Sequence, residues 1–190
     1  MRRSFVIAMM FLVTATGSWA AGPVVRWDRI EGVLAANLME IHVGDIPASG
    51  RWRTAGEGGA MLNLRTGFLS FRVEGISWAN HYPNGPLGAP ATGAVMGTVV
   101  CDSTDPWMVT VDTEPVPMDE GSGSFVGIID LPESCRARPE GIVFLLRHAA
   151  PGPLFGNFVA YGAGRSIQRD SAYRPIDDEL PFWPDRPVRN

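Results

Sequence analysis

The sequence predicts an all-β fold, a single antiparallel β-sandwich of about eight or nine strands with one disulfide. From Val24 onward, apolar residues recur with a period closer to two than to 3.6, and turn-forming residues interrupt them every 8 to 14 residues. The chain has 22 Gly and 16 Pro among its 190 residues. That share exceeds the usual ~12% and suits many short strands better than long helices.

The first two strands are expected over residues 24–34 and 38–46. The first places Trp27 and Ile30 among charged neighbours, and the second alternates apolar and polar residues in its second half. A Gly-rich loop, residues 47–59, follows them.

The next two strands are expected to form a hairpin over residues 60–64 and 68–76. Gly67 lies between the two arms and supplies the left-handed conformation that a tight turn needs. In the second arm, Leu69 and Phe71 share one face and alternate with polar residues. This pattern is typical of an antiparallel sheet with one solvated side.

The remaining strands lie between further turn signals. They are expected over residues 94–101, 108–111, 124–131, 142–147 and 158–161. A loop over residues 132–141 holds Cys135. No segment shows the period of a helix, and no internal repeat is present.

The first twenty residues are expected to be a signal peptide. Arg2 and Arg3 precede an apolar run over residues 5–13, and Ser18 and Ala20 are the small residues before the expected cleavage site. The alternative is a transmembrane anchor, which needs about 20 apolar residues. The run is too short for that, so export is the favoured interpretation.

The expected organisation therefore has three parts. Residues 1–20 form the signal peptide, residues 21–166 the β-sandwich domain, and residues 167–190 a C-terminal tail that is partly disordered. No segment after residue 20 is apolar for long enough to span a membrane. We expect the mature protein to be secreted or periplasmic.

The net charge of the chain argues against two classes of binding partner. The formal net charge is −4, and removal of the signal peptide lowers it to −6 because two arginines are lost. A mildly acidic chain without basic runs argues against nucleic acid and against an anionic membrane surface as partners.

The two cysteines of an exported protein predict a disulfide between Cys101 and Cys135.

Seven segments of the chain contain strand ends, turns and a cysteine, and their order along the sequence forms a pattern. They are residues 43–47, 62–67, 71–75, 96–102, 125–132, 144–147 and 160–163. Together they resemble small exported bacterial β-rich proteins of unassigned function over about residues 24–166. A more distant similarity is to the CHRD domain, an all-β module of chordin-like and bacterial secreted proteins. Members of that family often carry a His-x-His pair before a strand, where this chain has His81 alone.

No motif for catalysis or for a cofactor stands out. The chain lacks G-x-S-x-G, and a bridge between the cysteines leaves no thiol for nucleophilic chemistry. His42, His81 and His148 are scattered singly, whereas a zinc or copper site needs two or three close together. We expect no catalytic residue, no cofactor and no metal site.

Aromatic residues in or beside loops are the best indication of function. They are Trp52, Trp78, Tyr82 and Trp107. Such side chains can stack on sugar rings or anchor a protein partner, or they can fold back over the ends of a small core. The favoured interpretation is an exported, non-catalytic module that binds an unknown protein or polysaccharide. The alternatives are a metal-dependent or hydrolytic enzyme with a site assembled only in the fold, and a structural envelope protein.

Overall fold

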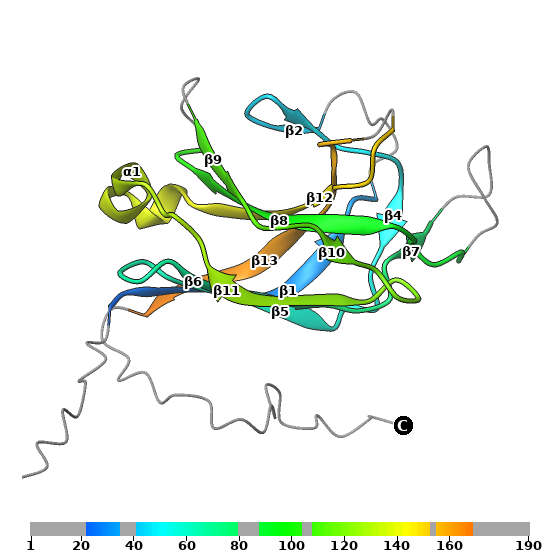
Figure 1. The fold of residues 1–190 in the computed structure, drawn as a ribbon, viewed down its shortest axis with the longest axis horizontal. Helices are drawn as coiled ribbons and strands as arrows, with labels where there is room; N and C mark the ends of the chain where they lie inside the picture. Colours follow the sequence, from blue (N-terminus) through cyan, green and yellow to red (C-terminus); the bar gives the residue numbers. More distant parts are fainter. Residues whose placement is uncertain (1–21, 35–40, 80–87, 104–107, 153–154, 169–190) are drawn as a thin grey trace, which may run out of the picture. The chain divides into compact units, whose positions relative to one another are not determined.

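The computed structural model describes residues 22–34, 41–79, 88–103, 108–152 and 155–168 (Figure 1). Its largest sheet is antiparallel and has nine strands, in the order β10-β8-β12-β13-β1-β5-β6-β11 with β9 paired to β8. These strands are β1 (Val24–Gly32), β5 (Gly58–Asn63), β6 (Phe68–Val73), β8 (Ala94–Cys101), β9 (Val109–Asp112), β10 (Val116–Pro117), β11 (Gly123–Ile128), β12 (Val143–His148) and β13 (Phe158–Gln168). Two small sheets pair β2 (His42–Val43) with β3 (Ile46–Pro47), and β4 (Trp52–Arg53) with β7 (Ser77–Trp78).

The all-β prediction with one disulfide is confirmed, and the large sheet curls into a half-barrel. Its two halves supply the two layers expected of a sandwich, with β8 and β12 facing β5, β6 and β11 (Figure 1). The ring of Phe71 on β6 lies 5.3 Å from that of Phe144 on β12, although these strands are not neighbours in the sheet. The main core therefore lies inside the curl.

Close packing across the curl depends on Gly97 in β8. A Cβ atom there would lie 2.5 Å from Cε1 of Phe71 and 3.2 Å from Cε2 of Phe144. The absence of a side chain at this position lets the two layers meet through aromatic rings. Trp27 completes the group, with its ring centroid 5.6 Å from that of Phe144.

The predicted hairpin is confirmed as β5 and β6. Gly67 takes the left-handed conformation, with φ of +72°. Its carbonyl accepts a hydrogen bond of 2.9 Å from the N–H of Ile129, next to β11. Leu69 and Phe71 point into the core with exposed fractions of 0% and 2%, as the alternation predicts.

A second, smaller core covers the outer surface of the sheet. The β2–β3 hairpin packs there over buried side chains of neighbouring strands. The buried members of this core are Val33, Ile46, Ala48, Val100, Leu145 and Phe158. The sequence predicted one strand over residues 38–46, but Gly44, with φ of +56°, turns the chain between two short strands.

Two further differences from the sequence prediction concern the last third of the chain. A five-residue helix, α1 (Glu133–Ala137), occupies the expected loop, followed by one 3₁₀ turn over Pro139–Gly141. One helical turn is too short to show a periodic pattern, which explains the omission. The last strand continues to Gln168, because β13 pairs with β1 as far as Val24. In the described ranges, no helix has the length and apolar character needed to cross a bilayer.

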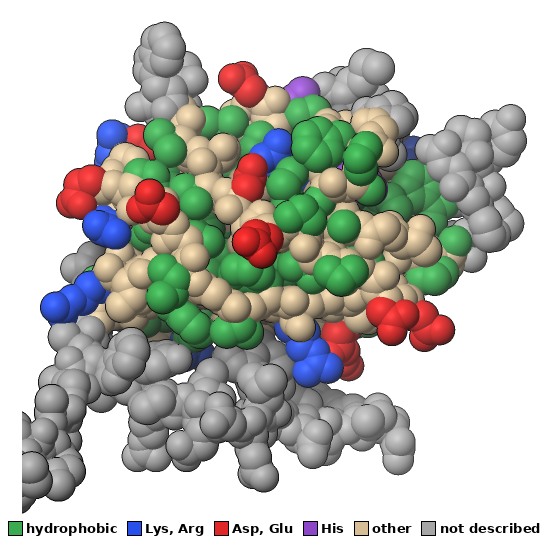
Figure 2. All heavy atoms as spheres, in the orientation of Figure 1, with side chains coloured by type: hydrophobic (Ala, Val, Ile, Leu, Met, Phe, Trp, Pro, Cys, Tyr) green, Lys and Arg blue, Asp and Glu red, His purple; other side chains and the backbone are tan. Residues whose placement is uncertain are grey.

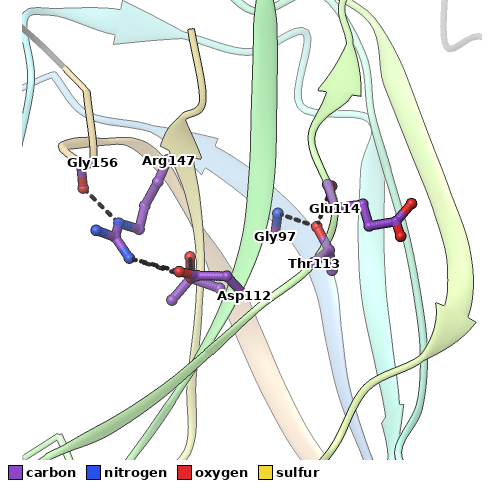
Figure 3. A network of polar contacts seen from close by, with 7 residues as sticks. Gly97, Asp112, Thr113, Glu114, Arg147 and Gly156 are labelled. Atoms are coloured by element: carbon purple, nitrogen blue, oxygen red, sulfur yellow. Dashed lines mark hydrogen bonds and ion pairs between the residues drawn. The ribbon is translucent and has the colours of Figure 1, made fainter. Parts of the chain in front are cut away.

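A network of polar contacts fixes β9 and the segment after it against the sheet (Figure 3). Arg147 on β12 pairs with Asp112 at 3.2 Å and donates to the carbonyl of Gly156. Thr113 accepts the N–H of Gly97 at 2.9 Å and donates to the carbonyl of Glu114. All of these bonds are internal to the chain, and they hold β9 and the segment after it in place.

Candidate ligand-binding groove

Trp52 and Trp78, two of the aromatics expected to meet a ligand, are buried. They lie opposite each other in β4 and β7, with ring centroids 4.5 Å apart in an edge-to-face arrangement. Only 8% and 6% of their surfaces are exposed. The expectation of a stacking surface formed by this pair is therefore wrong. Their rings fold over the end of the core, the alternative noted above.

Gly50 shows how tightly this pair is enclosed. Its φ is +63°, and a Cβ atom there would lie 2.5 Å from Cη2 of Trp78. The remaining two predicted aromatics, Tyr82 and Trp107, lie outside the described residues.

The exposed aromatic side chains of the described chain are Tyr161 and Phe155. Tyr161 is 36% exposed and Phe155 is 58% exposed. Tyr161 lines a groove of about 380 Å³ between β1, β4 and β13, and we call this the Tyr161 groove. Its lining contains both apolar and polar side chains. The apolar members are Val33, Leu34, Ile41 and Phe158, and the polar ones are Glu31, Arg53, Thr54 and Tyr161.

The position of the groove follows from the fold. At the end of β1, Gly32 lets β4 approach so closely that a Cβ atom would lie 2.3 Å from the carbonyl oxygen of Trp52. The N–H of Trp52 then donates to the carbonyl of Val33 at 2.7 Å. Thr54 continues this contact, since its hydroxyl donates to the carbonyl of Ile30 at 2.8 Å. One backbone hydrogen bond and one side-chain hydrogen bond thus hold β1 and β4 together beside the groove.

Tyr161 is fixed in place by an acidic partner on the neighbouring strand. The register of β1 and β13 places it opposite Glu31, and its hydroxyl donates to the carboxylate at 3.0 Å. The same carboxylate pairs with Arg29. The hydrogen bond from Arg29 lowers the pKa of Glu31, and the bond from Tyr161 acts in the same direction. Glu31 is therefore a carboxylate, and the pKa of Tyr161 is raised by burial and by this bond.

The groove presents both kinds of hydrogen-bonding group beside an apolar surface. Glu31 accepts hydrogen bonds, and the exposed Arg53 donates them. Leu34, with 65% of its surface exposed, extends the apolar wall. Ligand sites in proteins commonly combine an apolar lining with a few placed polar groups. This arrangement suits a ligand with an apolar face and several hydroxyl groups.

Sequence reasoning missed this groove. Its members are residues 31–34, 41, 53–54, 158 and 161, and only strand pairing brings them together. Tyr161 was placed at the end of a predicted strand, so its ring was not counted among the loop aromatics. No local motif marks any of these residues.

A second depression, of about 510 Å³, lies at the start of β11. Its lining includes Arg72, Glu74 and Ser124, and Arg72 pairs with Glu74. The pKa of the nearby Glu57 is raised because its carboxyl group lies beside that of Glu74. No aromatic side chain is among the lining residues of this depression, whereas Tyr161 lines the Tyr161 groove, so that groove is the stronger candidate.

The histidines expected to be separate surface residues differ in environment. His42 is exposed, His81 lies outside the described residues, and His148 is half-buried against Trp52. In the part of the chain that the structure describes, no three His, Cys, Asp or Glu side chains gather as metal ligands do.

His148 makes folding stability sensitive to pH. Burial lowers its pKa, and its Nε2 atom has no hydrogen-bond partner among the residues that the structure describes. The unfolded chain therefore binds a proton more readily than the folded one. We expect stability from this residue to be complete above the ordinary histidine pKa of about 6.5 and to fall as the pH drops below it.

Urea unfolding between pH 5 and pH 8 tests this expectation. His148→Gln should flatten the pH dependence of the unfolding free energy, while His42→Gln is the control at an exposed position. An unchanged slope in the His148 variant would contradict the assignment.

Comparison with known proteins adds no family assignment: no protein-family model, curated protein or solved structure matches this chain.

Proposed function

We propose that the protein is an exported, non-catalytic binding module that takes a segment of a polysaccharide in the Tyr161 groove. The observation that carries this proposal is the exposed ring of Tyr161, held by Glu31 at the mouth of an apolar groove. A ring fixed before binding loses little conformational freedom when the ligand arrives. The proposed site is therefore centred on a tyrosine of β13 and not on the predicted loop tryptophans.

The chemistry of the groove supports a saccharide. A pyranose ring has an apolar face of C–H groups that packs on an aromatic ring, and it has hydroxyl groups at its edge. Glu31 accepts from such hydroxyls and Arg53 donates to them, while Val33 and Leu34 line the apolar side.

The acid content of the groove supports binding without cleavage. Glycoside hydrolysis by the common route needs two carboxyl groups flanking the bond, with one of them protonated. Among the described lining residues, Glu31 is the single carboxyl group, and its pKa is lowered. A second acid in the proton-donating role is missing from that lining.

Export fits the same proposal. The Cys101–Cys135 bridge is compatible with an oxidising compartment. Residues 1–20 have the pattern of a signal peptide. A polysaccharide of the cell envelope or its surroundings is a ligand that such a protein would encounter.

Titration with soluble polysaccharides and cell-wall glycans tests the proposal. A ligand at 100 times its Kd should stabilise the protein by about 2.7 kcal/mol, which raises Tm by several degrees. Tyr161→Ala should weaken binding about tenfold or more, because it removes the central aromatic anchor. Tyr161→Phe keeps the ring and should lose less.

Phe155→Ala is the matched control, because it removes another exposed aromatic ring outside the groove. Equal losses in the Tyr161 and Phe155 variants would contradict the assigned site. Failure of every glycan to bind would contradict the ligand class.

A further inference from the structure

Arg53 gives the Tyr161 groove a positive charge that no described acid balances. Among the described lining residues, the other charged side chain is Glu31. Glu31 pairs with Arg29 and accepts a hydrogen bond from Tyr161, so its negative charge is shared between two donors within the chain. No described carboxylate forms an ion pair with Arg53. The groove therefore offers an uncompensated cation to a ligand.

Arginines elsewhere in the described chain are often neutralised. Figure 2 shows acidic and basic side chains interspersed on one face of the domain. The arginines that pair with a carboxylate are Arg29, Arg72, Arg136, Arg138 and Arg147. Arg53 differs from these because it combines an unbalanced charge with a place in the lining of a groove.

The guanidinium group of Arg53 is held by the neighbouring strand. The register of β4 and β7 places Arg53 opposite Ser77, and its Nε atom donates to Oγ of Ser77 at 3.1 Å. A Cβ atom at Gly88 would lie 3.2 Å from Nη2, so the guanidinium lies against a residue that has no side chain. Ser77 is neutral and engages Nε alone. The two Nη groups, which have no hydrogen-bond acceptor among the described residues, remain available to a ligand.

A carboxylate is the sugar substituent that best uses these two donors. The two Nη groups of an arginine match the two oxygens of a carboxylate, and such charge-assisted pairs are roughly twice as strong as neutral hydrogen bonds. A hydroxyl group offers one oxygen and no charge. A uronic acid carries the carboxylate beside its ring and keeps the apolar C–H face that packs on an aromatic side chain.

The acidic character of the whole chain does not decide the charge preference of the groove. The formal net charge is −4, but charges more than about 8 Å apart are largely screened at physiological salt. Asp28 lies near Arg29, yet it is not among the described residues that line the groove. The attraction of an anion into the groove therefore depends on Arg53.

We propose that the polysaccharide bound in the Tyr161 groove is acidic, with a uronic acid residue whose carboxylate pairs with Arg53. Because it concerns the same groove, this assignment rests on the proposed function. The volume of about 380 Å³ lies at the lower end of the range for small-ligand sites and suits a short segment of the polymer. The sugar ring packs on Tyr161, and its carboxylate meets the Nη groups of Arg53.

Isothermal titration calorimetry with polygalacturonate, alginate and hyaluronan tests the charge preference. Each polymer is compared with its methyl ester, which keeps the sugar backbone and removes the charge. At least one acidic polymer should bind with a Kd about fivefold below that of its ester, the upper range for an exposed ion pair. Arg53→Gln should remove most of this preference. Arg65→Gln is the matched control, since it removes the same charge from an exposed position outside the groove and should keep the preference.

The outcomes separate the charge preference from the proposed function. Equal affinity of the wild-type protein for acid and ester, or a preference that survives Arg53→Gln, overturns the acidic ligand. An equal loss in Arg53→Gln and Arg65→Gln also overturns it. The proposed function would still hold in these cases if Tyr161→Ala weakened binding of the ester or of a neutral glycan. Failure of all three acidic polymers overturns the acidic ligand, whereas the proposed function fails only if neutral glycans do not bind either.

Discussion

Phe144→Ala is expected to lower the free energy of unfolding by about 3–5 kcal/mol. Phe144 is fully buried in β12, and its ring packs against Trp27 on β1 and Phe71 on β6. Truncation of Phe144 leaves a cavity where the two layers meet, beside their close approach at Gly97. The total stability of a domain is about 5–15 kcal/mol, so this loss is a large fraction of it.

Guanidinium unfolding measures the effect. The midpoint should fall in Phe144→Ala, and Phe155→Ala, at an exposed position, should stay within about 0.5 kcal/mol of wild type. Phe144→Leu keeps most of the volume and provides a folded variant if the alanine variant does not fold. A Phe144→Ala protein within about 1 kcal/mol of wild type would mean that the two layers do not depend on this ring.

The parts of the fold that depend on local pattern were predicted well. The hairpin of β5 and β6 and the strand β8 each combine alternation with a turn signal, and their bounds lie close to those expected. Gly67 adopts the left-handed turn conformation that its position required. The bridge between Cys101 and Cys135, predicted from the expectation of export and from an even cysteine count, is present.

The features that depend on strand order were not predicted. Trp52 and Trp78 lie in two-residue strands, too short for any alternation to show that their rings are buried. Tyr161 meets Glu31, 130 positions earlier in the chain, because β13 pairs with β1. Sequence pattern indicates that strands exist, but here it did not indicate which strands pair. The candidate groove therefore appeared only in the structure.

Loss of the disulfide is expected to destabilise the protein by about 4 kcal/mol on the chain-entropy model, which treats the bridge as a constraint on the unfolded chain. Cys101 ends β8 and Cys135 lies in α1, 34 positions later in the sequence. Both side chains are buried, with exposed fractions of 1% and 0%. A five-residue helix is unstable alone, so α1 depends on this link and on packing for its place.

Two forms of the protein separate the effect of the cross-link from that of packing. The reduced wild-type chain loses the bridge but keeps both sulfur atoms, whereas Cys101→Ala/Cys135→Ala loses the bridge and buried volume. Guanidinium unfolding should show most of the loss in the reduced chain and a further, smaller loss in the double variant. Destabilisation confined to the double variant would assign the contribution to packing. Unchanged stability in both forms would contradict a structural role for the bridge and would leave α1 held by its apolar contacts.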